Sequence, residues 1–387
     1  MQIPYGRQTI EQEDIDAVAE VLRGDWLTQG PSVTRFEDGL CQAFGAAEAV
    51  AVNSGTAALH MGMAAMRIGP GDLVLVPPIT FAASANAARY CGADVAFVDV
   101  EPDTALIDAA ALDAFLTSYK GPLRPRAVVA VHYAGLPCDM NRLVDVCTRH
   151  HIDLIEDGCH APGATWVDTN GAVRHVGSAD VSAFVALSFH PVKHITTAEG
   201  GAVLTRRPEL ADRARLLRSH GITRDPARLE KNEGPWWYEM QELGFNYRMP
   251  DVLAALGTSQ LRRHSAWLER RREIAREYRA RFNGHPAITV QAEREGRQHA
   301  YHLFPVLVEQ RDHVFRELAA AGIRAQVHYI PVHVLPYYRE LYGAQHFPNA
   351  EEWYRRVMSI PMYHGMSDEA VRVVCDALDG ATAATQR

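Results

Sequence analysis

The sequence predicts an α/β protein with a large domain over residues 1–250, built on a mainly parallel sheet, and a smaller C-terminal α+β domain over residues 251–387. Short unbroken runs of Val, Ile, Leu and Ala alternate with helical segments in the first part of the chain. Continuous apolar runs of this kind are typical of parallel strands that are buried on both faces. The boundary is expected near Pro250, because a long helical stretch rich in Arg and Glu begins there.

The alternation predicts five strands joined by four helices. The expected strands cover residues 49–53, 73–76, 94–98, 127–133 and 153–156, and the expected helices cover residues 56–66, 81–90, 109–119 and 140–150. Two further strands are expected at residues 181–187 and 202–205, with no helix between them. The polar loop SFHPVKHITTAEGG joins these two strands, and we expect the chemistry of the protein in that loop.

The patterns in the smaller domain are weaker. We expect a helix over residues 251–282, strands near residues 302–308 and 324–329, and helices near residues 313–321 and 367–378.

Charge and cysteine content exclude several classes of function. Of the 387 residues, 47 are Asp or Glu and 39 are Lys or Arg, which gives a net charge of −8. A chain with this balance and no basic clusters is not expected to bind nucleic acid or an anionic membrane surface. The 6 cysteines are scattered without a CxxC pair, and the first residues hold no apolar run of the signal-peptide type. We therefore expect a cytoplasmic protein with reduced thiols and no membrane-spanning segment.

A candidate phosphate site follows the first expected strand. The chain passes through Asn53, Ser54, Gly55 and Thr56 directly into a helix. The free N–H groups and the positive dipole end of a helix N-terminus attract anions, Gly55 permits a close backbone approach, and Thr56 adds a hydroxyl donor. The alternative is a simple helix cap formed by Ser54 or Thr56.

Two charged residues occupy positions where such a sheet binds ligands. Asp157 follows the fifth expected strand, and open α/β sheets bind ligands at the carboxyl ends of their strands. Lys193 lies in the polar loop between uncharged or apolar neighbours. Loss of solvation would lower the pKa of this lysine and make it nucleophilic toward carbonyl groups. The alternatives are a surface turn or helix cap for Asp157 and a solvated surface side chain for Lys193.

These features together match the needs of pyridoxal 5'-phosphate, which has a phosphate, a pyridine nitrogen and an aldehyde. Proteins bind this cofactor through a lysine Schiff base and an acidic partner of the pyridinium nitrogen. Phe81, after the second expected strand, is suited to stack on the pyridine face. The alternative for Phe81 is ordinary core packing.

The sequence resembles the sugar-nucleotide aminotransferases of the DegT/StrS group, within the fold-type I pyridoxal-phosphate enzymes, over nearly its whole length. The matching segments are DWLTQGP, AVNSGTAALH, PPITFAASANA, LIEDGCHAPGA, SFHPVKHITTAEGGAV, RSHGI, GFNYRMPDVLAALGTSQL and AQVHYIPVH. Within the family, IPYGRQ, GDWLTQG, VHYAG and ITTAEGGAV resemble the subgroup that aminates C4 of the sugar in the pseudaminic acid pathway.

The resemblance implies a role for each of several residues. Lys193 is then the Schiff-base lysine, Asp157 the pyridinium partner and a catalytic residue with it, and His160 a neighbour of the phenolic oxygen of the cofactor. Phe81 stacks on the ring. The phosphate is bound by Gly55, Thr56 and Ser188, and by Asn246 of a neighbouring subunit, which implies a homodimer with shared active sites. The expected substrate-binding residues are Tyr5, Asp25, Trp26, Leu27, Thr28, Gly55, Ser188, Arg248, Gln326, Val327, His328 and Tyr329.

The expected reaction moves an amino group from glutamate, which leaves as 2-oxoglutarate, to C4 of a UDP-linked 2-acetamido-2,6-dideoxy-4-hexulose. Two alternatives stay open: an aminotransferase for another UDP- or dTDP-linked 4-keto-6-deoxysugar, and a non-catalytic regulator that keeps the fold. No metal is expected, because the segment from His328 to His333 lacks a carboxylate at metal-ligand spacing.

Overall fold

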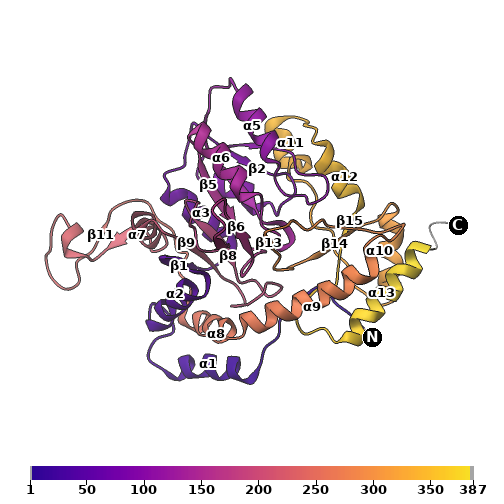
Figure 1. The fold of residues 1–387 in the computed structure, drawn as a ribbon. Helices are drawn as coiled ribbons and strands as arrows, with labels where there is room; N and C mark the ends of the chain where they lie inside the picture. Colours follow the sequence, from indigo (N-terminus) through magenta and orange to yellow (C-terminus); the bar gives the residue numbers. More distant parts are fainter. Residues whose placement is uncertain (1, 384–387) are drawn as a thin grey trace.

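The computed structural model describes residues 2–383, and a seven-stranded sheet lies at its centre (Figure 1). Its strands are β1 (Glu48–Val52), β2 (Asp72–Val76), β3 (Asp94–Phe97), β4 (Arg124–Val131), β5 (Asp153–Asp157), β8 (Val185–Ser188) and β9 (Gly201–Thr205). Their order is β1-β9-β8-β5-β4-β2-β3. Every neighbouring pair is parallel except those of β9, which runs antiparallel to both β1 and β8. The predicted mainly parallel sheet is confirmed, and so is the helix-free connection between its last two strands.

Helices cover both faces of this sheet. They are α2 (Pro31–Phe44), α3 (Gly55–Ala65), α4 (Ala83–Tyr90), α5 (Ala109–Ser118), α6 (Met140–His150) and α7 (Pro208–Leu217), whereas α1 (Gln12–Arg23) lies farther out, against a helix of the C-terminal part. Successive residues of a strand point to opposite faces. In β2, Val74 and Val76 pack in a core shared with α3, α4 and α7, whereas Leu75 packs in a core shared with α5 and α6. Burial on both faces explains why the strands are unbroken apolar runs in the sequence.

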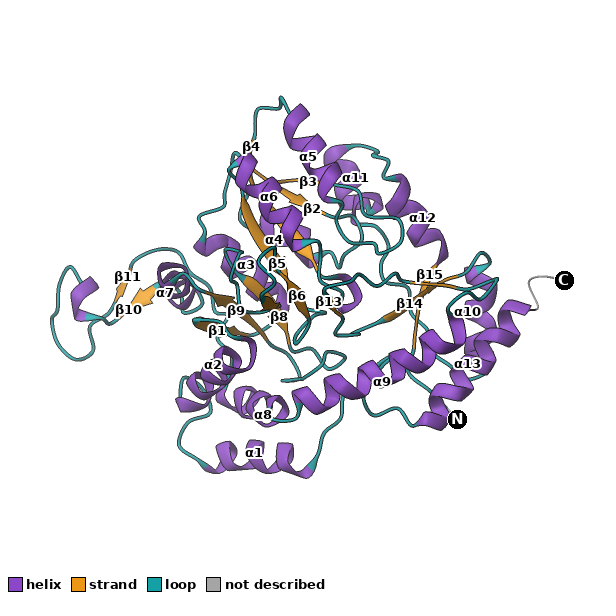
Figure 2. Cartoon of the chain, in the orientation of Figure 1, coloured by secondary structure: helices purple, strands orange, loops and turns teal. Residues whose placement is uncertain are grey.

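The C-terminal part combines long helices with a small antiparallel sheet in the order β12-β14-β15 (Figure 2). Its elements are α8 (Asp251–Leu261), α9 (His264–Phe282), β12 (Thr289–Val290), β14 (Phe304–Leu307), α10 (Arg311–Ala320), α11 (Pro336–Tyr342), α12 (Pro348–Arg356), β15 (Val357–Ile360) and α13 (Asp368–Ala383). The helix α8 lies against α1 and α2, and α9 lies against α13. A boundary at residue 250 stays a prediction.

Two expectations for this part are wrong. The single helix expected over residues 251–282 is two helices, α8 and α9, separated by Arg262 and Arg263, and the guanidinium of Arg263 pairs with Asp14 of α1 at 2.6 Å. Arginine is a good helix former, so no residue in the sequence marks this break. The strand expected at residues 324–329 is absent, and that segment makes only an isolated bridge between Gln326 and Ser359. Gln326 pairs with the edge strand β15 at this one position, and the neighbouring residues do not continue the pairing.

Two smaller features complete the fold. A sheet in the order β13-β6-β7 is formed by β6 (Thr165–Val167), β7 (Val173–His175) and β13 (Arg297–Gln298). An arm that contains β10 (Ile222–Thr223) and β11 (Glu239–Met240) projects from the body, at the left of Figure 1. No helix among residues 2–383 is long and apolar enough to cross a membrane.

A buried arginine ties α9 to the rest of the C-terminal part. Arg271 is only 1% exposed, and its Nη1 donates hydrogen bonds to the carbonyl oxygens of Tyr301, His302 and Met362 at 3.1, 3.3 and 3.0 Å. All three partners are main-chain oxygens. Burial lowers the pKa of Arg271 to about 10, so the guanidinium remains charged at neutral pH. The bonds fix the chain direction at residues 301 and 302 relative to α9.

The pairing of β1 with β9 depends on a glycine. Gly201 begins β9 opposite Val52, where the chain turns from β1 into α3. A Cβ atom at Gly201 would lie 2.4 Å from the carbonyl oxygen of Ser54 and 2.8 Å from the Cα of Gly55. Real side chains do not come this close to a backbone, so only glycine fits at this position.

We predict that Gly201→Ala destabilises the protein by about 1–3 kcal/mol, because β9 must move away from the turn after β1. Urea unfolding should show a lower midpoint with an unchanged slope. Gly380→Ala is the matched control, since Gly380 lies in α13 and a Cβ there meets nothing within 4 Å. Alanine should leave stability at that site unchanged or raise it by up to ~1 kcal/mol. An unchanged midpoint for Gly201→Ala would contradict the prediction.

Candidate active site

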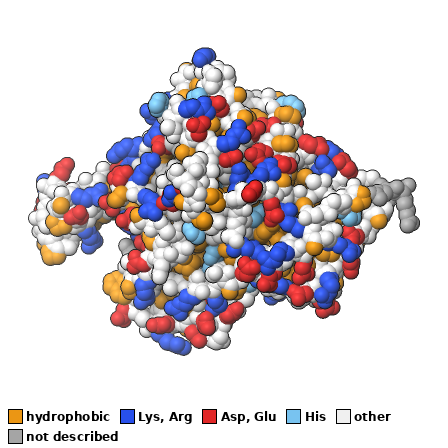
Figure 3. Space-filling model, viewed as in Figure 1, with side chains coloured by type: hydrophobic (Ala, Val, Ile, Leu, Met, Phe, Trp, Pro, Cys, Tyr) orange, Lys and Arg blue, Asp and Glu red, His pale blue; other side chains and the backbone are white. Residues whose placement is uncertain are grey.

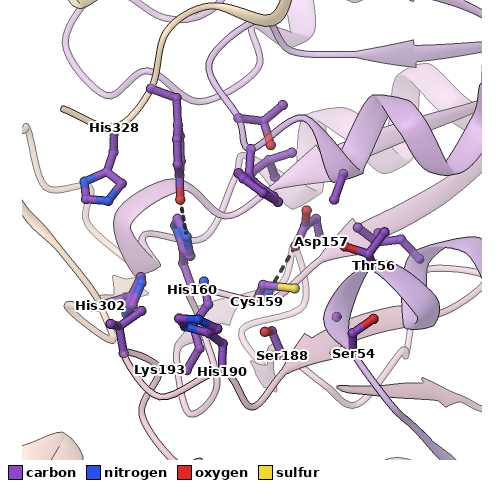
Figure 4. Close-up of a pocket in the computed structure, with 18 of the residues that line it drawn as sticks. Ser54, Thr56, Asp157, Cys159, His160, Ser188, His190, Lys193, His302 and His328 are labelled. Atoms are coloured by element: carbon purple, nitrogen blue, oxygen red, sulfur yellow. Dashed lines mark hydrogen bonds between the residues drawn. The ribbon is translucent and has the colours of Figure 1, made fainter. Parts of the chain in front are cut away.

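A cavity of about 400 Å³ opens at the carboxyl ends of the parallel strands (Figure 4). It brings together ten of the residues expected from the sequence: Tyr5, Gly55, Thr56, Phe81, Asp157, His160, Ser188, Lys193, His328 and Tyr329. Ser54, Thr80, Cys159, His190, Glu199 and His302 line it as well. The expected sites of cofactor and substrate therefore form one continuous space.

Eight expected residues, four of them in segment 25–28, do not line this cavity. Asp25 and Trp26 border a separate cavity between α1, α2 and α8. Leu27, Thr28, Asn246, Arg248, Gln326 and Val327 lie outside the active-site cavity of the single chain. Segment 25–28 is joined to the start of α8, where the backbone N–H of Asp251 donates to the carbonyl oxygen of Leu27 at 3.0 Å.

The phosphate end of the cavity is the turn from β1 into α3. Ser54 is the N-cap of α3, and its hydroxyl accepts a hydrogen bond from the N–H of Ala57 at 3.1 Å, so the capping alternative holds for Ser54. Gly55 and Thr56 begin the helix, whose first N–H groups have no partner within it. A Cβ at Gly55 would lie 2.8 Å from the Cβ of Ser188. Gly55 thus lets the hydroxyl of Ser188 stand beside the helix N-terminus, an arrangement that fits a phosphate group.

Asp157 is the last residue of β5 and is only 7% exposed, so the surface-turn alternative is wrong. Its Oδ2 accepts a hydrogen bond from the hydroxyl of Ser84 at 2.6 Å, and its Oδ1 accepts one from the N–H of Cys159 at 3.2 Å. The Ser84 hydroxyl is also 2.7 Å from that of Thr80. These bonds stabilise the charged carboxylate and hold it in one orientation. A carboxylate fixed in this way at the strand end fits a protonated ring nitrogen.

A second set of hydrogen bonds holds the carboxyl end of β5 in place. The side chain of Glu156, one residue before Asp157, is buried and bonds to His132 Nε2 at 2.9 Å and to the Ser182 hydroxyl at 2.6 Å. The N–H of His132 donates to the carbonyl oxygen of Asp157 at 3.2 Å. Both sides of β5 are therefore anchored where it delivers its carboxylate.

Lys193 lies in the loop between β8 and β9, and its side chain faces the cavity rather than open solvent. Burial lowers the pKa of the amine, and the neighbouring Cys159 and Asp157 oppose this effect only in part. The loop is closed by main-chain bonds from Phe189 to Gly200 and from Thr197 to Phe189, both at 2.9 Å. An amine in this environment is suited to attack a carbonyl carbon.

Two aromatic residues form the other walls. Phe81 is 61% exposed within the single chain and lines the cavity, so the core-packing alternative is wrong. His160 is buried; its Nδ1 accepts a hydrogen bond from the N–H of Ala134 at 3.3 Å, and its Nε2 lies 3.0 Å from the hydroxyl of Tyr329. Burial and the nearby Lys193 hold the pKa of His160 well below its ordinary value. The ring is therefore neutral at physiological pH.

Sequence reasoning missed the residues that act on Asp157 and Lys193 from other elements. Ser84 had a usable signal, because it is a small hydroxyl side chain at the start of the helix that follows the second strand of the sheet. His302 had no such signal. The centroid of its ring lies 4.4 Å from that of His160, but the two residues are far apart in the sequence and only the fold brings them together.

A cavity lysine with a lowered pKa, a carboxylate at a strand end and a phosphate cradle at a helix N-terminus, all on an α/β sheet, define an enzyme of the pyridoxal-phosphate type. The chain belongs to the DegT/DnrJ/EryC1/StrS aminotransferase family, whose sequence pattern matches residues 8–379. The protein is a sugar aminotransferase, as the resemblance implied, and it uses pyridoxal 5'-phosphate.

Individual relatives match over nearly their whole length. The chain is 38% identical to the spore coat polysaccharide biosynthesis protein SpsC of Bacillus subtilis, covering 97% of this chain and 96% of SpsC. It is 37% identical to the UDP-4-amino-4,6-dideoxy-N-acetyl-beta-L-altrosamine transaminase of Campylobacter jejuni, again covering 97% and 96%.

Solved structures agree with this assignment. Helicobacter pylori PseC, described as an aminotransferase involved in the biosynthesis of pseudoaminic acid, superposes with a TM-score of 0.89 at 29% identity, covering 99% of this chain and 100% of PseC. The sugar aminotransferase Spr1654 of Streptococcus pneumoniae, solved in a PMP form, superposes with a TM-score of 0.90 at 29% identity, covering 99% of each chain. The expected fold class is therefore confirmed.

We predict that Ser84→Ala weakens pyridoxal-phosphate binding by about tenfold or more, because Asp157 loses a charge-assisted hydrogen bond. Titration of the cofactor-free protein, followed by the absorbance of the bound cofactor, measures this affinity. Ser182→Ala is the matched control: it removes a hydroxyl that bonds at the same distance, 2.6 Å, to a carboxylate of the same strand, Glu156, but Glu156, unlike Asp157, does not line the cavity. It should lower stability and leave cofactor affinity unchanged. Equal affinities for Ser84→Ala and the native protein would refute the role assigned to Ser84.

Proposed function

We propose that the protein transfers the amino group of glutamate to C4 of a UDP-linked 2-acetamido-2,6-dideoxy-4-hexulose, in the biosynthesis of pseudaminic acid. The observation that carries this proposal is the single cavity that joins Lys193, Asp157 and the phosphate cradle to Tyr5, His328 and Tyr329. The name of the Campylobacter relative, a transaminase of a UDP-linked 4-amino-4,6-dideoxy sugar, supports the substrate. An enzyme of this pathway would work in the cytoplasm.

The names of the relatives do not all specify an acceptor sugar. The relative from Bacillus subtilis is slightly more similar and carries a name from spore coat polysaccharide biosynthesis, which specifies no ketosugar. Another UDP- or dTDP-linked 4-keto-6-deoxysugar therefore remains the alternative acceptor.

Each group of cavity residues has a separate role in the proposed reaction. Bound pyridoxal phosphate supplies the electron sink and carries the amino group between the two substrates. Lys193 would hold the cofactor covalently, and its free amine would move a proton at the reacting carbon as a general acid–base, which its lowered pKa favours. Asp157 would keep the ring nitrogen protonated, and Gly55, Thr56 and Ser188 would hold the phosphate. Phe81 would pack on the ring.

In a homodimer with shared sites, expected residues that do not line the cavity of their own chain would line the cavity of the partner. Asn246 is exposed, and Arg248 bridges Val52 at the end of β1, so both lie beside the phosphate cradle of their own chain without lining it. Trp26 and Leu27 are exposed as well. In the proposed dimer, Asn246 reaches the phosphate of the partner's cofactor, and segment 25–28 and Arg248 contribute to sugar-nucleotide binding.

The projecting arm supports the same assembly. Its side chains Trp236, Tyr238, Met240 and Leu243 are between 52% and 80% exposed, and Figure 3 shows hydrophobic side chains on the surface of this arm. A monomer rarely leaves such side chains together in water, so a second copy of the chain is the proposed occupant of this surface.

We predict that a panel of UDP- and dTDP-linked 4-keto-6-deoxysugars, tested with glutamate, will show highest kcat/KM for the UDP-linked 2-acetamido compound, by about tenfold or more. Product mass identifies the aminated sugar. Lys193→Ala should give no product with any sugar, and Lys193→Arg should not rescue it, because a guanidinium stays protonated. A clear preference for a dTDP-linked sugar would overturn the substrate while the aminotransferase activity stands.

We further predict that mixing inactive Lys193→Ala with impaired Asn246→Ala subunits restores activity. Half of the dimers are then mixed, and each has one intact site, so recovery should approach about a quarter of native activity. Mixing Lys193→Ala with Lys193→Arg is the control and should recover nothing, since both changes fall in the same chain's lysine. No recovery for the first mixture, with subunit exchange confirmed by mass spectrometry, would contradict shared sites.

A further inference from the structure

A chain of hydrogen bonds with a fixed direction runs through His160 to the cavity. The N–H of Ala134 donates to His160 Nδ1 at 3.3 Å, and a backbone N–H cannot accept. Nδ1 therefore carries no proton, and the single proton of the neutral ring is on Nε2. That proton is donated to the hydroxyl oxygen of Tyr329, 3.0 Å away, a bond dashed in Figure 4.

The direction of this chain determines what Tyr329 does. Because its oxygen already accepts a hydrogen bond from His160, its own O–H is not used there and is free for another acceptor. Tyr329 lines the cavity, and burial raises the pKa of its phenol well above the ordinary value, so the proton stays in place at neutral pH. The ring is also fixed by contacts with Phe81 and His160, at centroid distances of 6.2 and 6.0 Å.

The position of His160 relates this donor to the reaction centre. His160 lies between Tyr329, which it bonds, and Lys193, which is close enough to lower the pKa of the histidine. A sugar carbon that exchanges a proton with Lys193 must lie on the same side of the cavity. When the ketosugar first binds, before nitrogen replaces oxygen on that carbon, the ketone oxygen is the acceptor nearest to both groups.

We propose that the hydroxyl of Tyr329 donates a hydrogen bond to the oxygen on the sugar carbon that is aminated, so that it orients and polarises the ketone at C4. This assignment rests on the proposed function, since it names the atom that one cavity residue recognises. His160 is the positioning residue of the pair, because it acts only through Tyr329.

Binding to a sugar that cannot react tests the hydrogen bond directly. The probes are UDP-N-acetylglucosamine, whose C4 hydroxyl stands in for the ketone oxygen, and its 4-deoxy analogue. Calorimetry with the native holoenzyme should show about two- to tenfold tighter binding of the C4-hydroxyl sugar, and Tyr329→Phe should remove this difference. Tyr329→Phe that retains the difference, or a native enzyme that shows none, would overturn the assignment.

The matched control is Tyr133→Phe. Tyr133 is a neighbouring buried tyrosine whose hydroxyl donates to the carbonyl oxygen of His328 at 2.7 Å, so its proton is already used within the protein. This change should lower thermal stability and keep the preference for the C4-hydroxyl sugar.

Rapid kinetics of the two half-reactions give an independent answer. Tyr329→Phe should slow the ketosugar half-reaction by about tenfold or more and leave the glutamate half-reaction unchanged. Equal loss in both halves would assign Tyr329 to the cofactor and overturn the proposal, as would no loss in either. If the native enzyme converts only a dTDP-linked ketosugar, the proposed substrate fails, and the same comparison with that ketosugar still decides the role of Tyr329.

Discussion

The contact between Gly201 and the turn at Ser54 is the constraint on which the active site depends. It allows β9 to run antiparallel to β1 up to the start of α3, so the loop that carries Lys193 ends directly against the phosphate cradle. The other partner of β9 is β8, which ends in Ser188, and β8 in turn lies beside β5, which ends in Asp157. Three functions that are far apart in the sequence therefore occupy adjacent strand ends. Larger side chains at position 201 would separate them.

Much of this arrangement could be predicted from the sequence, because buried parallel strands leave a strong pattern. The order of strands and helices, the helix-free connection around Lys193 and the strand-end position of Asp157 all follow from apolar runs and from the rule that ligands bind at carboxyl ends. The prediction of a strand at residues 324–329 failed because alternating polar and apolar residues look the same whether the segment joins a ladder or makes one bridge. The prediction of one helix over residues 251–282 failed because local helix propensity does not mark the break at Arg262 and Arg263.

The parts of the site that could not be predicted are those made by contacts between distant segments. Ser84 and Asp157 are joined by one hydrogen bond across 73 positions of sequence, and Tyr329 and His160 by one across 169. A motif can name Asp157 and His160, but the direction in which their hydrogen bonds run is a property of the folded backbone. That direction turns His160 from a general neighbour of the cofactor into the group that determines where the Tyr329 proton is available.

The three hydrogen bonds of Arg271 fix the backbone of the cavity wall and do not depend on its side chains. Because the guanidinium holds carbonyl oxygens, which every amino acid has, the side chains at positions 301, 302 and 362 can change without loss of the bonds that shape this wall. Evolution, or an engineer, can therefore vary the residue that faces the ligand at position 302 while its backbone stays in place. Arg271 has no such freedom, because its Nη1 group alone makes all three of these bonds. A single invariant position in α9 would thus permit diversification of acceptor sugars around a constant catalytic lysine.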